Sequence, residues 1–279
     1  MKMKTIDEQV FNGIRKTINR FREKPFNYFT EADIHSSLLN DIMTGGSDVL
    51  SVRKNNISIS LVHQEYPTNF RFKKKQLLEG YNWTYNEEET SLNSKKGARG
   101  NFDLAILNPE FIDKSNIKYP NEYLYHLINK DAEMAKIRMR DQDTFKKELL
   151  YAIEVKFIHY RNARHKAMIE EIIKDNEKLR LAHCHSNGFI NPINLIFCSS
   201  EKKERSDKKI PVIEKIKSYV QGLPIELYDK LNRSYERPIQ VLMIFTESFI
   251  DIKGKTTTKP IANFNNNNMK WAQELINIL

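Results

Sequence analysis

The chain has few cysteines and lacks a long apolar run. Its two cysteines, Cys184 and Cys198, form no paired ligand pattern among 279 residues, so the sequence predicts neither a disulfide framework nor a secreted protein. No stretch approaches the ~18 consecutive apolar residues that a membrane span needs. The lysine-containing N-terminus has no apolar segment of the kind found in secretory signals. We therefore expect a cytoplasmic protein with no membrane association.

Two common nucleotide and metal motifs are also missing. No Gly-x-x-x-x-Gly-Lys-Ser/Thr loop occurs, and Gly254-Lys255-Thr256 matches only its end, so the sequence gives no sign of an ATP motor. His183-Cys184-His185 has no second cysteine or histidine pair at ligand spacing, which argues against a structural zinc site.

What the chain has in excess is positive charge. Lysine and arginine number 45 against 36 aspartates and glutamates, giving a formal net charge of +9 and a pI of about 9.3. Such a surplus favours a polyanionic partner, nucleic acid first. Because 40% of the residues are apolar and charges of both signs are interspersed, most of the chain is expected to fold.

The spacing of apolar residues predicts helices interleaved with strands. A helix is expected over residues 5–22, and Thr30 with Asp33 predicts a capping box for a helix that ends near Gly45. Further strands are expected at Ile57–Glu65, Asn101–Leu107, Leu149–Ile158, Ile193–Cys198 and Ile239–Phe245, and further helices at Arg164–His183, at Val212–Val220 and at the C-terminus. Residues 68–98 are predicted to be a loop or irregular hairpin, and residues 112–149 to be helical in their second half. This order predicts an α/β layer fold in which helices flank a central mixed β-sheet.

The most strand-like run carries two opposite charges. Side chains alternate across a strand, so Glu154 and Lys156 point the same way while Val155 points to the other face. A carboxylate and an ammonium are thus presented together from an apolar strand. Burying them is unfavourable unless something compensates their charges, as a metal ion and a phosphate would.

A third charge lies alone in the strand Asn101–Leu107. Asp103 is on the face opposite Phe102 and Leu104, where a lone carboxylate is unusual. Two carboxylates from neighbouring strands supply hard oxygen ligands for Mg²⁺ or Mn²⁺. Lys156 would then orient or deprotonate a metal-bound water, or stabilise the phosphate oxygens.

Asp103, the Glu154-x-Lys156 triplet and the helix that follows resemble the PD-(D/E)XK nuclease superfamily, over about residues 30 to 200. The resemblance implies a restriction-endonuclease-like core at residues 30–205, a helical extension at 1–29 and an α/β extension ending in a helix at 206–279. It implies that Asp103 and Glu154 bind metal, that Lys156 assists hydrolysis, and that a further acid, Glu31 or Glu65, completes the metal site. Val155, within the triplet, is included among the metal-site residues. Asp103 follows Phe102 rather than proline, a departure from the family's pattern.

Two other triplets compete with Glu154-Val155-Lys156. Glu201-Lys202-Lys203 is expected in a polar loop, where solvation explains it. Asp251-Ile252-Lys253 follows an apolar run but has no strand–helix unit behind it. The strand setting favours the Glu154 copy.

Several residues near the triplet are candidates for nucleic-acid contacts. They are Arg99, Tyr160, Arg161, Arg164 and Lys178, and the basic clusters Lys73–Lys75 and Lys95–Lys96 are interleaved with aromatic residues. On the helix after the triplet, Lys174, Asp175 and Lys178 are expected to face the site. Each of these residues also has a plain reading as a solvated surface group.

The sequence therefore predicts an Mg²⁺- or Mn²⁺-dependent endo- or exonuclease, with DNA preferred over RNA and a homodimer among the expected states. One alternative is a nuclease-fold module that binds nucleic acid or another partner without cutting. Another is a different α/β hydrolase that uses Asp251 and Lys253.

Overall fold

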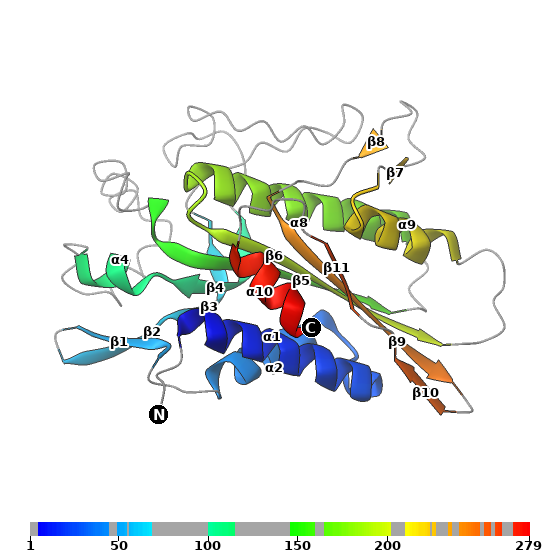
Figure 1. Cartoon of the computed structure of the whole chain (residues 1–279), viewed down its shortest axis with the longest axis horizontal. Coiled ribbons are helices and arrows are strands. Elements are labelled where there is room, and N and C mark those ends of the chain that lie inside the picture. Colours follow the sequence, from blue (N-terminus) through cyan, green and yellow to red (C-terminus); the bar gives the residue numbers. More distant parts are fainter. Residues whose placement is uncertain are drawn as a thin grey trace. The chain divides into compact units, whose positions relative to one another are not determined.

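The chain folds into two compact units. The computed structural model describes residues 5–44, 49–54, 56–68, 100–114, 146–159, 165–201, 210–223, 225–226, 234–235, 240–251, 254–257, 260–263 and 270–279 (Figure 1). Unit 1 comprises Met1–Ile6, Gly46–Ile153 and Glu177–Pro192, and unit 2 comprises Asp7–Gly45, Glu154–Asn176 and Ile193–Leu279. Strand β5 (Leu149–His159) and helix α8 (His165–His185) contribute residues to both units. The domain boundaries expected near residues 29 and 205 stay predictions.

Unit 1 contains three antiparallel strands in the order β3-β4-β5. Strand β3 (Val62–Pro67) pairs with β4 (Asn101–Leu107), and β4 pairs with the first half of β5 through Leu104 and Ile153. Strands β1 (Ser51–Lys54) and β2 (Ile57–Ser60) form a separate two-stranded sheet, and the short helix α4 (Pro109–Lys114) follows β4. The predicted strand Asn101–Leu107 is confirmed.

The single strand predicted over Ile57–Glu65 is wrong, because the chain changes partners at Leu61. The Leu61 N–H donates to the Leu50 carbonyl (2.8 Å), and its own carbonyl accepts from the Leu107 N–H (2.7 Å). Leu61 thus separates β2, which pairs with β1, from β3, which pairs with β4. Pro67 belongs to β3 and pairs with Asn101.

Unit 2 holds the mixed part of the sheet, in the order β10-β9-β6-β5. Strand β6 (Asn191–Glu201) runs parallel to β9 (Leu242–Asp251). Strands β10 (Gly254–Thr257) and β11 (Ile261–Asn263) pair antiparallel with β9, and β7 (Ile225–Glu226) forms a small sheet with β8 (Ser234–Tyr235). The expectation of a mixed α/β fold is confirmed.

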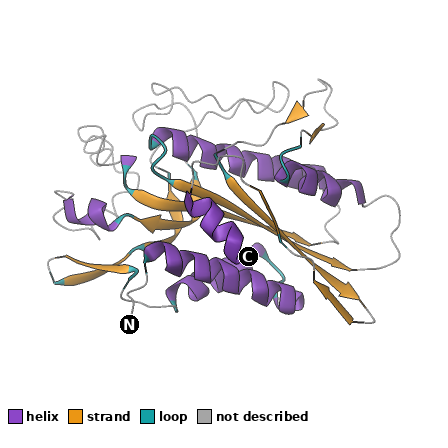
Figure 2. Cartoon of the chain, in the orientation of Figure 1, coloured by secondary structure: helices purple, strands orange, loops and turns teal. Residues whose placement is uncertain are grey.

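Helices cover both faces of the strands in unit 2 (Figures 1 and 2). On one face, Phe21 of α1 (Ile6–Glu23) packs against Phe197 of β6, with ring centroids 5.1 Å apart. On the other face, Lys217 of α9 (Ile210–Val220) reaches Glu247 of β9, which pairs with Cys198. Because Phe197 and Cys198 are consecutive, strand alternation sends them to opposite faces.

Helices α1 and α2 (Glu31–Met43) pack closely in unit 2. A Cβ atom on Gly13 would lie 2.8 Å from the Cα atom of Ile42, so only glycine permits this approach. The Gln9 side chain donates to the Ile42 carbonyl (2.6 Å), and buried Asp41 accepts from Thr17 (2.9 Å). These contacts hold α2, which carries one of the candidate site residues.

The other predicted elements agree with the structure in type and differ in extent. Helices α8, α9 and the C-terminal helix α10 (Lys270–Ile278) are confirmed. Strand β6 continues through Ser199, which was expected in a loop, because Ser199 pairs with Ser248 of β9. The strand expected at Ile239–Phe245 begins at Leu242 and continues to Asp251, which forms a hairpin with Gly254 in a segment expected to be a linker.

Two predictions fall mainly on residues that the structure leaves undescribed. They are the loop at 68–98 and the helical second half of 112–149. Among the helices that are described, none combines the length and the apolar character that crossing a membrane requires.

Candidate active site on strand β5

Strand β5 carries the predicted triplet at an internal position. The strand order places β5 between β4 and β6, so it is not an edge strand. Glu154 is 2% exposed and Val155 is fully buried, whereas the Lys156 side chain keeps some access to solvent. The strand predicted at Leu149–Ile158 is confirmed, and it holds a carboxylate in a buried setting where a charge requires compensation.

Lys156 is surrounded by carboxylates of unit 2. Its Nζ atom lies 3.3 Å from Glu31, 3.5 Å from Asp175 and 3.6 Å from Glu171. Burial alone would lower the pKa of Lys156, but the three carboxylates outweigh burial and raise the pKa above its ordinary value. Lys156 is therefore an ammonium at neutral pH.

Helix α8 supplies two of these carboxylates. Glu171 and Asp175 are four residues apart, so they lie on the same side of the helix. Asp175 is the better enclosed of the two, with a side chain 14% exposed against 57% for Glu171. The expectation that Asp175 faces the triplet is confirmed, whereas Lys174 is exposed to solvent.

Glu31 is held by the start of helix α2. Thr30 is the N-cap, and its side chain and that of Asp33 form the predicted capping box. Glu31 is the first residue of the helix, and its carboxylate accepts a hydrogen bond from the Phe157 N–H (3.2 Å). The cap and this bond together fix a carboxylate beside the Lys156 ammonium.

Asp103 lies on β4, which pairs with the part of β5 that belongs to unit 1. Leu104 pairs with Ile153, and Asp103 precedes Leu104 while Glu154 follows Ile153. Asp103 is partly exposed, and Glu154 is buried.

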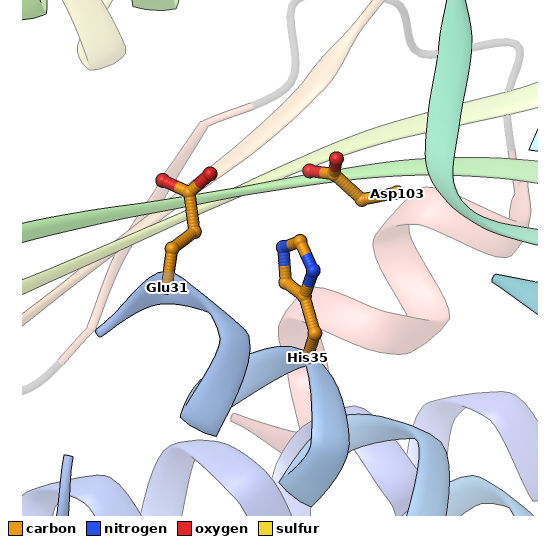
Figure 3. Close-up of side chains that lie close together, drawn as sticks. All are labelled: Glu31, His35 and Asp103. Atoms are coloured by element: carbon orange, nitrogen blue, oxygen red, sulfur yellow. The ribbon is translucent and has the colours of Figure 1, made fainter. Parts of the chain in front are cut away.

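Asp103 also belongs to a cluster of metal-ligand groups. One ligand atom from each of Glu31, His35 and Asp103 lies within 4.8 Å of the others, and their side chains point toward one another (Figure 3). His35 follows Glu31 by four residues on α2, which puts both on one side of the helix. Carboxylate oxygens and imidazole nitrogen are donors that suit divalent ions such as Mn²⁺.

His35 and Glu171 were missed from the sequence. The signal that could have found them is four-residue helical spacing, from Glu31 to His35 and from Glu171 to Asp175. That spacing is common in a chain with 29% charged residues, so it becomes informative only when a strand partner is known.

Glu65, the other candidate for the additional acid, has a different setting. Its neighbours Gln64 and Tyr66 pair with Leu104 and Phe102, so Glu65 lies across from Asp103. Its backbone has a φ of 50°, in the left-handed region, and its carboxylate is exposed. The Asn101 amide donates to it over 3.5 Å.

Of the predicted nucleic-acid contacts, the structure describes Lys178. Its ammonium donates to the Asn101 carbonyl (2.8 Å) and lies 6.0 Å from the centroid of the Phe102 ring. The others lie outside the described residues: Arg99, Tyr160, Arg161, Arg164 and the two lysine clusters. Lys203 and Lys253, the lysines of the rival triplets, also lie outside them.

No family model, curated protein or solved structure matches the chain. The chemistry of the site therefore rests on its own residues. They are a buried glutamate, a partly buried lysine, an aspartate from the adjacent strand and three further carboxylates from two helices. Such a set can bind a divalent cation and an anionic substrate group side by side.

Proposed function

We propose that the chain is a divalent-metal-dependent nuclease with a PD-(D/E)XK site in a restriction-endonuclease-like core. Its substrate is the phosphodiester backbone of nucleic acid, with DNA preferred over RNA. The observation that carries the proposal is the surplus of acid at the triplet. One ammonium, Lys156, contacts three carboxylates, and buried Glu154 lies two residues before it.

The donor set fits Mg²⁺ or Mn²⁺. With all groups ionised, the formal charge of Glu31, Glu154, Glu171 and Asp175 against Lys156 is −3, from four negative charges and one positive. Asp103 adds another negative charge from the neighbouring strand. Hard divalent cations are held by carboxylate oxygens of this kind. When bound, such an ion neutralises phosphate charge and lowers the pKa of a coordinated water.

We assign Asp103, Glu154 and Glu31 to the metal, with Val155 as the strand residue that spaces the triplet. Glu31 is preferred over Glu65 because its carboxylate contacts both the Lys156 ammonium and the β5 backbone. Glu65 is exposed, and its carboxylate accepts a hydrogen bond from the Asn101 amide. His35 is an additional nitrogen donor.

Lys156 serves as a phosphate anchor in this proposal. A general base must be able to lose its proton near neutral pH, and the three carboxylates favour the protonated form of Lys156. A fixed ammonium instead stabilises negative charge that develops on the phosphate oxygens. Glu171 and Asp175 position this ammonium from α8.

Cleavage of a panel of DNA and RNA substrates with Mg²⁺ or Mn²⁺ tests the proposal. We expect Lys156→Ala and Glu154→Ala to lower cleavage by about 100-fold or more, while circular dichroism shows retained folding. Lys174→Ala, an exposed lysine on α8, is the matched control and should cleave normally. Full activity in Lys156→Ala would contradict the role assigned to Lys156. Absence of cleavage by the wild-type chain would favour the non-cutting module.

A further inference from the structure

Helix α1 and the short helix η1 (Pro25–Asn27) border a basic surface pocket in unit 2. The pocket has a volume of about 360 Å³ and is lined by Lys16, Asn19, Arg20, Glu23, Lys24 and Asn27. Three of these side chains are cationic and one is anionic. The pocket is therefore suited to an anion.

Two of the cations, Lys16 and Arg20, lie on α1, and Lys24 follows the end of the helix. The three are spaced four residues apart, and the Lys24 N–H donates to the Arg20 carbonyl (2.8 Å), so we call them the cationic stripe. Part of the positive charge of Arg20 is balanced within the chain, because its guanidinium contacts buried Asp41 (2.6 Å). Lys16 and Lys24 are exposed.

Two exposed aromatic rings follow Lys24 in the chain. Phe26 is 60% exposed and Phe29 is 77% exposed, whereas Tyr28 between them is buried. The turn is held by hydrogen bonds from the Asn27 N–H to the Lys24 carbonyl (3.1 Å) and from the Tyr28 N–H to the Pro25 carbonyl (3.3 Å). The backbone thus presents both phenylalanines outward in a fixed arrangement.

We propose that Lys16, Arg20, Lys24, Phe26 and Phe29, the α1–η1 surface, bind a single-stranded segment of nucleic acid. Cationic side chains neutralise phosphates, and exposed aromatic rings stack on unpaired bases without regard to sequence. Paired bases in a duplex do not present their faces for such stacking. The combination of cations and exposed rings therefore selects an unpaired strand.

The α1–η1 surface leads directly to the candidate active site. Phe29 precedes Glu31 by two residues, a span of at most about 7 Å along the chain. Glu31 contacts Lys156. A strand stacked on Phe29 is thereby brought beside the triplet, so this inference deepens the proposed nuclease function and rests on it.

Binding of a fluorescein-labelled oligothymidylate of about 15 nucleotides tests the surface. Anisotropy is measured with the full chain in EDTA, so that cleavage plays no part. We expect the double variant Phe26→Ala/Phe29→Ala to weaken binding by about 10-fold or more, and binding of a duplex of the same length to change less than about two-fold. We expect Lys16→Gln/Lys24→Gln to lower the slope of log affinity against log salt by about 1.4, since each single-strand phosphate contact contributes about 0.7.

Matched controls come from elsewhere in unit 2. Leu223→Ala removes another exposed apolar side chain, and Lys270→Gln removes an exposed lysine; both should bind as the wild type does. Arg20 is left intact because its loss would leave buried Asp41 without this partner. Thermal melting of each variant confirms that the fold is retained.

Three outcomes would overturn the inference. The first is wild-type affinity in the phenylalanine variant, and the second is an equal loss of duplex and single-strand binding in that variant. The third is a self-associated wild-type chain whose association, measured by sedimentation, is lost in the phenylalanine variant. That result would assign the surface to a second copy of the chain. Because binding is measured without metal, failure of the two proposals can be told apart. A chain that binds through this surface but never cleaves contradicts only the nuclease, and a nuclease whose surface variants bind and cleave normally contradicts only the surface.

Discussion

Two lysines of unit 2, Lys156 and Lys217, meet carboxylates in contrasting ways. Lys217 lies 2.8 Å from Glu247, which is 4% exposed, and 3.1 Å from the more exposed Glu214. Lys156 lies near three carboxylates, and a buried fourth is two residues away in the same strand. At Lys217 one ammonium faces two carboxylates, of which only Glu247 is buried. At Lys156 the excess of acid is larger, because one ammonium has four carboxylates near it when Glu154 is included.

The contrast shows that charge balance, rather than a shifted pKa, distinguishes the two places. The pKa of Lys217 is also raised: burial lowers it, and the hydrogen bond and charge of Glu247 outweigh burial. Both lysines are thus held as ammonium ions. Of these two clusters, the one at Lys156 carries the larger formal negative charge, −3 with Glu154 included against −1 at Lys217, and a cation from solution could compensate it.

The largest expected effect is a difference in cleavage rate between variants of the two lysines. Lys156→Met should lower cleavage by about 100-fold or more, because the ammonium that stabilises the phosphate is lost. Lys217→Met should cleave at the wild-type rate. The measurement is the initial rate of cleavage by both variants under identical metal and substrate concentrations, and equal losses would remove the distinction between the two lysines.

At Lys217 the expected effect is on stability. Lys217→Met leaves buried Glu247 without its ammonium, so we expect the free energy of unfolding in urea to fall by about 2–3 kcal/mol, less than for a fully buried pair. The variant Lys217→Met/Glu247→Leu removes both charges and should recover most of this loss. No recovery in the double variant would show that Lys217 contributes through packing.

A smaller effect distinguishes the two acids of α8. Asp175→Asn should lower kcat by about 10-fold with little change in KM, because Asp175 positions the Lys156 ammonium from an enclosed site. Glu171→Gln should lower kcat by about two-fold or less, since Glu171 is solvent-screened. Asp175→Glu should restore part of the rate, and Glu170→Gln is the matched control on the same helix. A change in the KM of Asp175→Asn with an unchanged kcat would contradict the positioning role.

The smallest effect concerns stability at the cap of α2. Thr30→Ala should lower the free energy of unfolding by about 1 kcal/mol, measured in urea.

The pH dependence of the same cap depends on Asp33. The backbone N–H groups of Phe29 and Thr30 hold the pKa of Asp33 below its ordinary 3.8. The stabilisation is therefore complete above pH 3.8 and is lost as the pH falls through the lower folded-state value. Asp33→Asn should show a shallower loss of stability in urea titrations between neutral and acid pH; an unchanged slope would contradict this.

Local patterns predicted the parts of the molecule that depend on neighbouring residues. The capping box of α2 and the strand around Glu154 follow from short-range spacing, and both are confirmed. The break at Leu61 depends on hydrogen bonds to Leu50 and Leu107, so the strand pattern alone could not reveal it. The hairpin of β9 and β10 likewise depends on the pairing of Asp251 with Gly254. The sequence there does not alternate apolar and polar residues, so no strand was predicted.

The partners of the triplet were less predictable, because they come from distant segments. Glu31 and Phe157 are 126 residues apart in sequence yet share a hydrogen bond. Sequence spacing therefore could not choose between Glu31 and Glu65 as the additional acid. Their contacts in the structure distinguish them. His35 and Glu171 show only the four-residue spacing that many solvated helix pairs share.

A calorimetric titration with Mn²⁺ tests the central claim most directly, because it asks whether the surplus of acid binds a divalent cation. We predict saturable binding in the wild-type chain and in Lys217→Met, weakened by about 10-fold or more in Asp103→Asn and Glu154→Gln. Absence of binding in the wild type, or the same affinity in Asp103→Asn and Glu154→Gln as in the wild type, would contradict the account.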